Sequence, residues 1–111
     1  MAQTARASFK NSRITPRSAT LSSEVDQVNV LTSSPNTLVA PANVNRTYLT
    51  IRNQNATAGE DLRYDYFDNP NMLTEGFLLK ASEAVDLDTT SAVYARAATA
   101  NVILSTDEGS G

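Results

Sequence analysis

Residues 47–54, TYLTIRNQ, decide the fold class because apolar and polar side chains alternate along them. Successive side chains of a β-strand point to opposite faces of its sheet, so a period of two indicates a strand with one buried and one wet face. One face carries Thr47, Leu49 and Ile51. The opposite face carries Tyr48, Thr50 and Arg52. We therefore expect Leu49 and Ile51 to point into a core.

Segments on both sides of this stretch have the same character. They are short, rich in Val, Leu, Ile, Thr and Tyr, and closed by Asn, Asp, Pro, Gly or Ser, which is typical of strands joined by turns. The eight predicted strands are residues 28–32, 36–40, 47–54, 62–67, 76–80, 84–88, 92–97 and 101–106. Residues 22–28 have a second interpretation, a single helical turn, since Ser23 and Asp26 have the spacing of a capping box.

The alternation recurs in the other segments and predicts two packed antiparallel sheets. The side chains expected to point inward are Leu62, Tyr64 and Tyr66, Phe77 and Leu79, Val85 and Leu87, Val93 and Ala95, and Val102 and Leu104. We predict an all-β chain: a small antiparallel β-sandwich, jelly-roll or Greek-key like, over residues 25–111, with an extended basic N-terminal arm over residues 1–24. An immunoglobulin-like sandwich is the alternative, because periodicity counts strands without ordering them.

Length and composition predict one soluble domain. The chain has 111 residues, of which 41% are apolar and 19% charged, and this length supports a single core. No apolar run approaches the roughly 18 residues that a membrane-spanning helix needs. The chain has no cysteine, so no disulfide can stabilise it, and we expect it to assemble inside a cell.

The charges are distributed unequally. Residues 1–20 carry four cations and no anion, whereas the remaining five cations face all twelve anions, so the two parts have opposite net charge. The basic leader also lacks a periodic apolar face, and Pro16 interrupts any helix there. We therefore expect an arm whose large apolar side chains after Met1 are Phe9 and Ile14.

The residue types argue against catalysis. Without His and Cys the chain lacks the commonest general base, metal ligand and thiol nucleophile, so we predict no enzyme, cofactor or metal. Carboxylate pairs remain as candidates for a glycosidase: Asp65 with Asp68, Glu60 with Asp61, and Asp86 with Asp88, the last about 7 Å apart on one strand face. A calcium site at Asp65, Asp68, Asn69 and Asn71 is a further alternative, although it lacks the Gly and bidentate Glu of known loops.

Four tyrosines predict a second kind of surface. Tyr48, Tyr64, Tyr66 and Tyr94 are suited to stacking on a sugar, to a protein interface or to the edge of a core. Nucleic acid is disfavoured as a partner, because the domain that carries them is acidic and repels phosphate.

Residues 45–109 resemble small virion proteins of tailed bacteriophages. The resemblance rests on NRTYLTIRNQNAT (45–57), in which Arg46, Tyr48, Leu49, Ile51 and Asn53 match a strand pattern, and on GFLLKASEAVDLDTTSAVYARAATANVILSTDEG (76–109). Gly76, Leu79 and residues 92–95 match the later patterns, followed by a short Glu-Gly tail. Similar proteins are head decoration or cement proteins and head or tail accessory proteins, so the resemblance implies structural work without catalysis.

The resemblance implies a partner for the sandwich, whereas the basic arm lies outside residues 45–109 and its role is argued from its own residues. We expect a homo-oligomer on the outer surface of a capsid, assembled in the bacterial cytoplasm, with the major capsid protein as its partner and without nucleic acid or membrane. The arm residues expected to bind the capsid are Arg6, Phe9, Lys10, Arg13, Ile14 and Arg17. The cations would steer the arm onto an acidic shell, and the apolar pair would anchor it. A small tail, neck or fibre-attachment protein and a carbohydrate-binding module are the alternatives.

Overall fold

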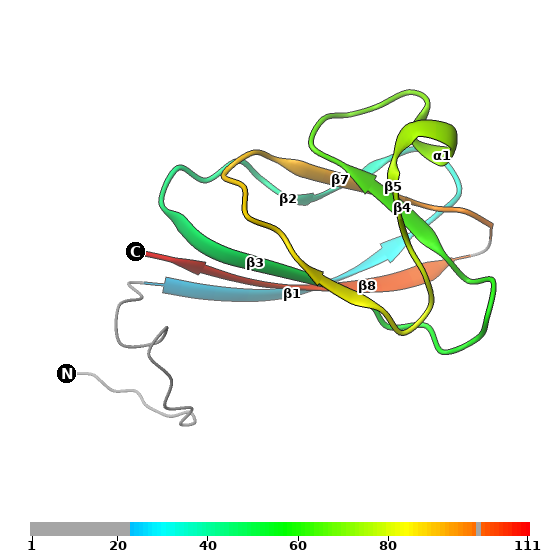
Figure 1. Cartoon of the computed structure of the whole chain (residues 1–111), viewed down its shortest axis with the longest axis horizontal. Helices are drawn as coiled ribbons and strands as arrows, with labels where there is room; N and C mark the ends of the chain where they lie inside the picture. Colours follow the sequence, from blue (N-terminus) through cyan, green and yellow to red (C-terminus); the bar gives the residue numbers. More distant parts are fainter. Residues whose placement is uncertain (1–22, 100) are drawn as a thin grey trace.

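The computed structural model describes residues 23–99 and 101–111, which form two antiparallel sheets of four strands each packed face to face (Figure 1). The strands are β1 (Ser23–Leu31), β2 (Thr37–Ala40), β3 (Arg46–Asn53), β4 (Leu62–Asp65), β5 (Phe77–Leu79), β6 (Ala84–Asp86), β7 (Val93–Ala97) and β8 (Val102–Ser110). One short helix, α1 (Met72–Glu75), lies between β4 and β5. The predicted all-β sandwich is confirmed.

Each predicted strand is present, but the first and last are longer than predicted. β1 begins at Ser23 and pairs with β8 without interruption from Ser23 opposite Ser110 to Leu31 opposite Val102. The helical-turn interpretation of residues 22–28 is therefore wrong for residues 23–28. The tail after residue 106 continues β8, because β8 lies between β1 and β3 and both neighbours pair along it.

The strand order identifies the sandwich as a jelly roll. One sheet has the order β1-β8-β3-β6 and the other β2-β7-β4-β5. The neighbours β1 and β8, β2 and β7, β3 and β6, and β4 and β5 are nested pairs, as in a two-stranded ribbon that is rolled up on itself. An immunoglobulin-like sandwich places its first two strands side by side, whereas β1 and β2 lie in different sheets here.

The core lies between the sheets and is aliphatic. Leu49, Ile51, Leu79, Val93 and Leu104, the five strongest sequence candidates, are all buried. The sheets also enclose Leu31, Val39, Leu62, Val102 and the small side chains of β7.

The prediction for Thr47 is wrong. Thr47 is exposed, and Arg46 takes the buried position at this end of β3. A bulge between Arg46 and Tyr48 explains the difference, since an extra residue in one strand reverses the alternation beyond it. The bulge therefore brings a guanidinium, rather than a hydroxyl, into the interior.

Two aromatic side chains on the predicted inner face are less buried than expected. Phe77 lies opposite Tyr64 in the strand register, yet it is 51% exposed, and Tyr66 is 38% exposed. The helix α1 was also absent from the sequence prediction. A single turn of four residues is too short to show a helical period, and its buried anchor is Met72.

Truncating Ile51 to Ala should lower the free energy of unfolding by about 2 to 5 kcal/mol, because it leaves a cavity among fully packed side chains. Arg52→Ala, one position along the same strand and exposed, should change it by less than about 0.5 kcal/mol. Denaturant titration of both variants measures this difference, and similar small changes would contradict the assigned register.

Candidate interaction surface

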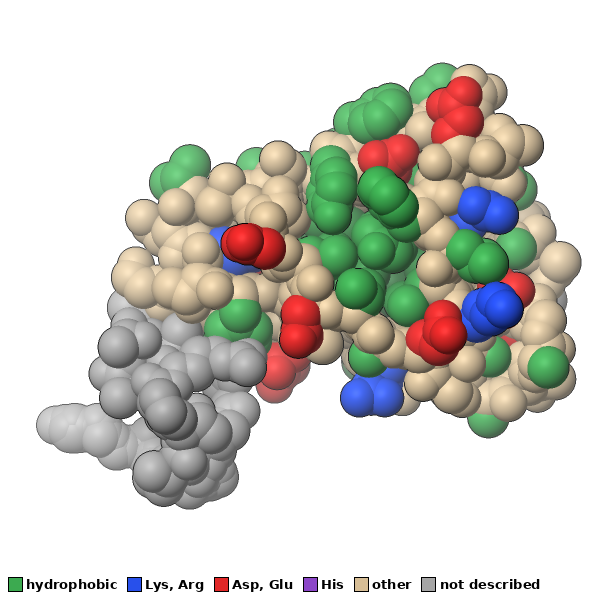
Figure 2. Space-filling model, in the orientation of Figure 1, with side chains coloured by type: hydrophobic (Ala, Val, Ile, Leu, Met, Phe, Trp, Pro, Cys, Tyr) green, Lys and Arg blue, Asp and Glu red, His purple; other side chains and the backbone are tan. Residues whose placement is uncertain are grey.

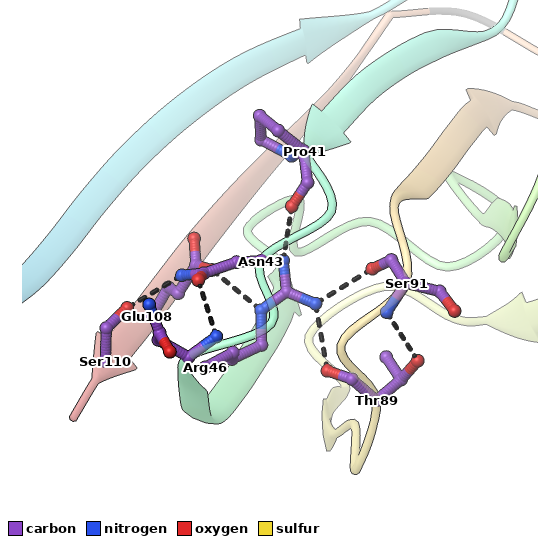
Figure 3. A network of polar contacts seen from close by, with 8 residues as sticks. Pro41, Asn43, Arg46, Thr89, Ser91, Glu108 and Ser110 are labelled. Carbon is purple, nitrogen blue, oxygen red and sulfur yellow. Dashed lines mark hydrogen bonds and ion pairs between the residues drawn. The ribbon is translucent and has the colours of Figure 1, made fainter.

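Arg46, at the start of β3, connects this strand to three other segments at one end of the sandwich (Figure 3). Its Nε donates to Glu108 Oε2 of β8 at 2.7 Å. Its Nη1 donates to the carbonyl oxygens of Thr89 and Ser91 at 2.9 and 2.8 Å, and its Nη2 donates to that of Pro41 at 2.7 Å. The guanidinium thus bonds both loops that flank it, the connection from β2 to β3 and the connection from β6 to β7.

Glu108 is held by a second donor. Asn43 Nδ2 donates to Glu108 Oε2 at 3.2 Å and to Ser110 Oγ at 2.7 Å (Figure 3). The side chains of Arg46 and Glu108 are 1% and 13% exposed, so the ion pair is largely removed from water. Removing one partner of such a buried pair strongly destabilises the protein, because the other charge is left uncompensated.

A polar hollow of about 390 Å³ lies beside this network. It is lined by Arg46, Thr47, Tyr48, Leu87, Asp88, Thr89 and Thr90. Of the pair Asp86 and Asp88, which the sequence suggests as two catalytic carboxylates, only Asp88 lines this hollow. Asp86 is the last residue of β6, and Asp88 lies in the loop that follows. Asp86 instead accepts a hydrogen bond from Thr50 Oγ1 at 2.6 Å. Asp86 and Asp88 therefore do not both line this hollow.

The other two carboxylate pairs serve turns. Glu60 accepts a hydrogen bond from Asn55 Nδ2 at 3.1 Å, and Asp61 accepts one from the backbone of Ala81 at 3.3 Å. Asp68 accepts one from Asn36 Nδ2 at 2.7 Å. Glu60 therefore closes its own loop, whereas Asp61 and Asp68 each tie one loop to another.

The residues of the calcium alternative bond to one another and to their own loop. Asn69, only 2% exposed, donates through Nδ2 to Asp65 Oδ2 at 3.1 Å and accepts from the backbone N–H of Asn71 at 2.8 Å. Asp65 Oδ1 accepts from the backbone of Tyr66 at 2.8 Å. Within residues 23–99 and 101–111, no three acidic side chains converge as metal ligands would. These oxygens therefore order the connection between β4 and β5.

The four tyrosines do not form one flat row. Tyr48 lies in β3 of one sheet, and Tyr64 and Tyr94 lie in β4 and β7 of the other. Tyr94 is opposite Asp65 in the strand register, so it points to the other face of the sheet from Tyr64. The four tyrosines therefore do not form the exposed flat row that would stack on a sugar.

Three rings, Tyr64, Tyr66 and Phe77, gather instead into an aromatic cluster. Their centroids are 5.3 to 6.5 Å apart, and the rings are inclined at 33° to 72° to one another. Tyr64 is 7% exposed. Burial raises the pKa of its hydroxyl, and the neighbouring Tyr66 adds a smaller effect in the same direction. The cluster thus has a fixed, buried base and two partly exposed rings.

The cluster lies where the sandwich is thinly covered. β5 and β6, each three residues long, are the edge strands of the two sheets on this side. Figure 2 shows apolar side chains gathered in a hollow over the middle of this face, with both acidic and basic side chains around it. Asp65 is the last residue of β4, and Asp68 and Glu75 lie in the loop and the helix that follow it. An apolar centre with a charged margin is suited to binding another protein surface.

The predicted arm residues, Arg6, Phe9, Lys10, Arg13, Ile14 and Arg17, lie outside the described residues. Sequence analysis missed both features of this site. In the sequence, Arg46 stands out only as part of a strand pattern. The rings of the aromatic cluster fall into two groups there, the residues predicted to point inward and the set of four tyrosines. The period of two does reveal Tyr64, Tyr66 and Phe77 as one face, but the short length of β5 leaves that face uncovered.

Arg46→Met should lower the free energy of unfolding by about 3 to 5 kcal/mol, because Glu108 loses its cationic partner and three carbonyl oxygens lose their donor. Arg52→Met, on the same strand but exposed, is the matched control and should be nearly neutral. Arg46→Lys should fall between them, since an ammonium keeps the charge without the planar fork. Thermal unfolding followed by circular dichroism measures all three, and equal stability of the two Met variants would show that the network is dispensable.

Comparison with protein-family models, with curated proteins and with solved structures finds no match for this chain. In the part of the chain that the structure describes, no helix has the length and apolar character needed to cross a membrane. The interpretation of function therefore depends on the residues and geometry described above.

Proposed function

We propose that this chain is a non-enzymatic structural protein of a tailed-phage virion, a head decoration or cement protein that binds the major capsid protein on the outer surface of the assembled head. The observation that carries the proposal is the aromatic cluster of Tyr64, Tyr66 and Phe77, with two rings partly exposed on a rigid sandwich. Rings anchored in this way are typical of the centre of a protein interface. The resemblance of residues 45–109 to small virion proteins supports the choice of partner.

The proposal assigns different work to the sandwich and to the N-terminal segment. Asp65, Asp68 and Glu75 lie close in sequence to the three rings of the aromatic cluster, whereas residues 1–20 carry four cations and no anion. The two surfaces therefore suit different patches of a shell, the sandwich an apolar patch with basic neighbours and the basic segment an acidic one. A repeating lattice offers both patches to each bound copy, and this supports binding as a homo-oligomer.

A small tail, neck or fibre-attachment protein would use the same surface and is the second candidate. It differs only in which virion component presents the apolar patch. The carbohydrate-binding alternative has less support, because the rings of the cluster are inclined to one another and do not make a flat platform.

Binding of the full chain to purified heads that lack it tests the surface. Tyr66→Ser and Phe77→Ser should each weaken binding by about tenfold or more, because an anchoring ring contributes about 2 kcal/mol. Val44→Ser, in the loop before β3 and 86% exposed, is the control for loss of an exposed apolar side chain elsewhere. Cosedimentation with heads, with unfolding curves for each variant, separates lost binding from lost folding. Undiminished binding of both ring variants would contradict the assignment of the surface.

Deleting residues 1–20 should weaken binding to the same heads without changing the melting temperature of the sandwich. Neutralising Arg6, Lys10, Arg13 and Arg17 should slow association and flatten its dependence on salt, because exposed charges act over about 8 to 10 Å at ordinary ionic strength. Replacing Phe9 and Ile14 by Ser should instead speed dissociation. Surface-based kinetics over a salt series measures both rates, and full binding by the deleted chain would remove the arm from the proposal.

A further inference from the structure

The edge strand β1 differs from the other edges of the sandwich. β2 has four residues and a register shift, and β5 and β6 have three residues each. β1 has nine residues and pairs with β8 in an unbroken register. Its sequence, SEVDQVNVL, contains no proline, lysine or arginine. Natural edge strands are usually protected by such residues, by bulges or by being short, and β1 has none of these three protections.

The outer face of β1 is apolar at its C-terminal half. Val28 and Val30 are 70% and 57% exposed, and Ile103, directly opposite Val30 on β8, is 42% exposed. Both anions of β1, Glu24 and Asp26, lie in its N-terminal half. Within residues 23–99 and 101–111, the five residues from Gln27 to Leu31 therefore combine a backbone edge that no other strand covers, an exposed apolar stripe and no charge.

A buried amide in the same half lacks a partner. Asn29 lies opposite Leu104 in the register, so its side chain is on the inner face of the sheet. Its Nδ2 is buried and has no hydrogen-bond partner within the described part of the chain. Leaving a buried donor unpaired is costly, so a neighbour that supplies an acceptor would be favoured.

We infer that β1 pairs with β1 of a second copy of this chain, antiparallel and centred on Asn29, so that two four-stranded sheets join into one of eight strands. A two-fold axis through Asn29 places Val28 of each copy opposite Val30 of the other. It also places the two Asn29 side chains opposite each other, where each Nδ2 can donate to the other Oδ1 once the buried amide turns toward the strand edge.

The charges on β1 select this register over its neighbour. In the register centred on Asn29, the two Asp26 residues lie six positions apart along the strands, roughly 20 Å. In the register centred on Val28 they lie closer, at four positions, and each Val30 faces an Asp26 instead of a valine. The Asn29-centred register therefore pairs apolar side chains and separates the anions.

The extent of the contact indicates a weak dimer. A pairing of five to six residues spans about 20 Å and belongs to the low end of specific interfaces, for which we expect a dissociation constant in the micromolar range. This self-association does not rest on the proposed virion function. On a capsid, however, the high local concentration of bound copies would favour it.

The absence of cysteine allows a direct test in the full chain. A single Asn29→Cys substitution places two thiols opposite each other at about 4.5 to 5.5 Å between Cβ atoms, close to disulfide geometry. We expect this variant to form a disulfide-linked dimer under mild oxidation. Gln27→Cys is the matched control on the same face, since its two thiols would lie roughly 13 Å apart and should not link. Linking of Gln27→Cys without Asn29→Cys would overturn the register.

Sedimentation velocity of the unmodified full chain, over about 1 to 300 µM, tests the dimer itself. Val30→Lys should raise the dissociation constant by about tenfold or more, because it removes two valine contacts and brings two cations close together. Val44→Lys, at a more exposed valine outside β1, should leave the dissociation constant unchanged. A chain that stays monomeric at the highest concentration, or a dimer that Val30→Lys does not weaken, would overturn the inference.

Discussion

The hydrogen bonds that the Arg46 guanidinium donates hold one end of the sandwich together. Four hydrogen bonds connect the guanidinium to β8 and to the two loops that close this end. Because the carbonyl groups of those loops point inward, they need a donor, and water has little access to a side chain that is 1% exposed. The bulge after Arg46 makes this possible, since it turns the arginine rather than Thr47 toward the interior.

The nested strand pairs determine which surfaces are left free. Rolling up a two-stranded ribbon places β8 and β7 inside their sheets and leaves β1, β2, β5 and β6 at the edges. Three of these edges are short, so they offer little backbone for pairing but leave side chains uncovered near β5 and β6. The aromatic cluster occupies that opening. β1 is the long edge, and it offers backbone and an apolar stripe together. The two kinds of edge therefore support two kinds of contact, one with a partner protein and one with a second copy.

The connection between β4 and β5 shows how polar residues can suggest a metal site while performing a structural task. Asp65, Asp68, Asn69 and Asn71 are hard oxygen ligands close together in sequence. In the structure they bond to each other, to the backbone and to Asn36, and so hold the loop that carries Tyr66 beside Phe77. The carboxylates thereby help to position the aromatic cluster.

The fold class and most of the core can be predicted from the residues alone, because side-chain alternation is a local property of each strand. The period of two was enough to place Leu49, Ile51, Leu79, Val93 and Leu104 inward. Only the tertiary structure decided the order of the strands, since pairing such as that of β1 with β8 joins residues about eighty positions apart. It also decided the burial of Arg46 and the exposure of Phe77, because a bulge and the shortness of an edge strand depend on the neighbouring strand rather than on the residue itself.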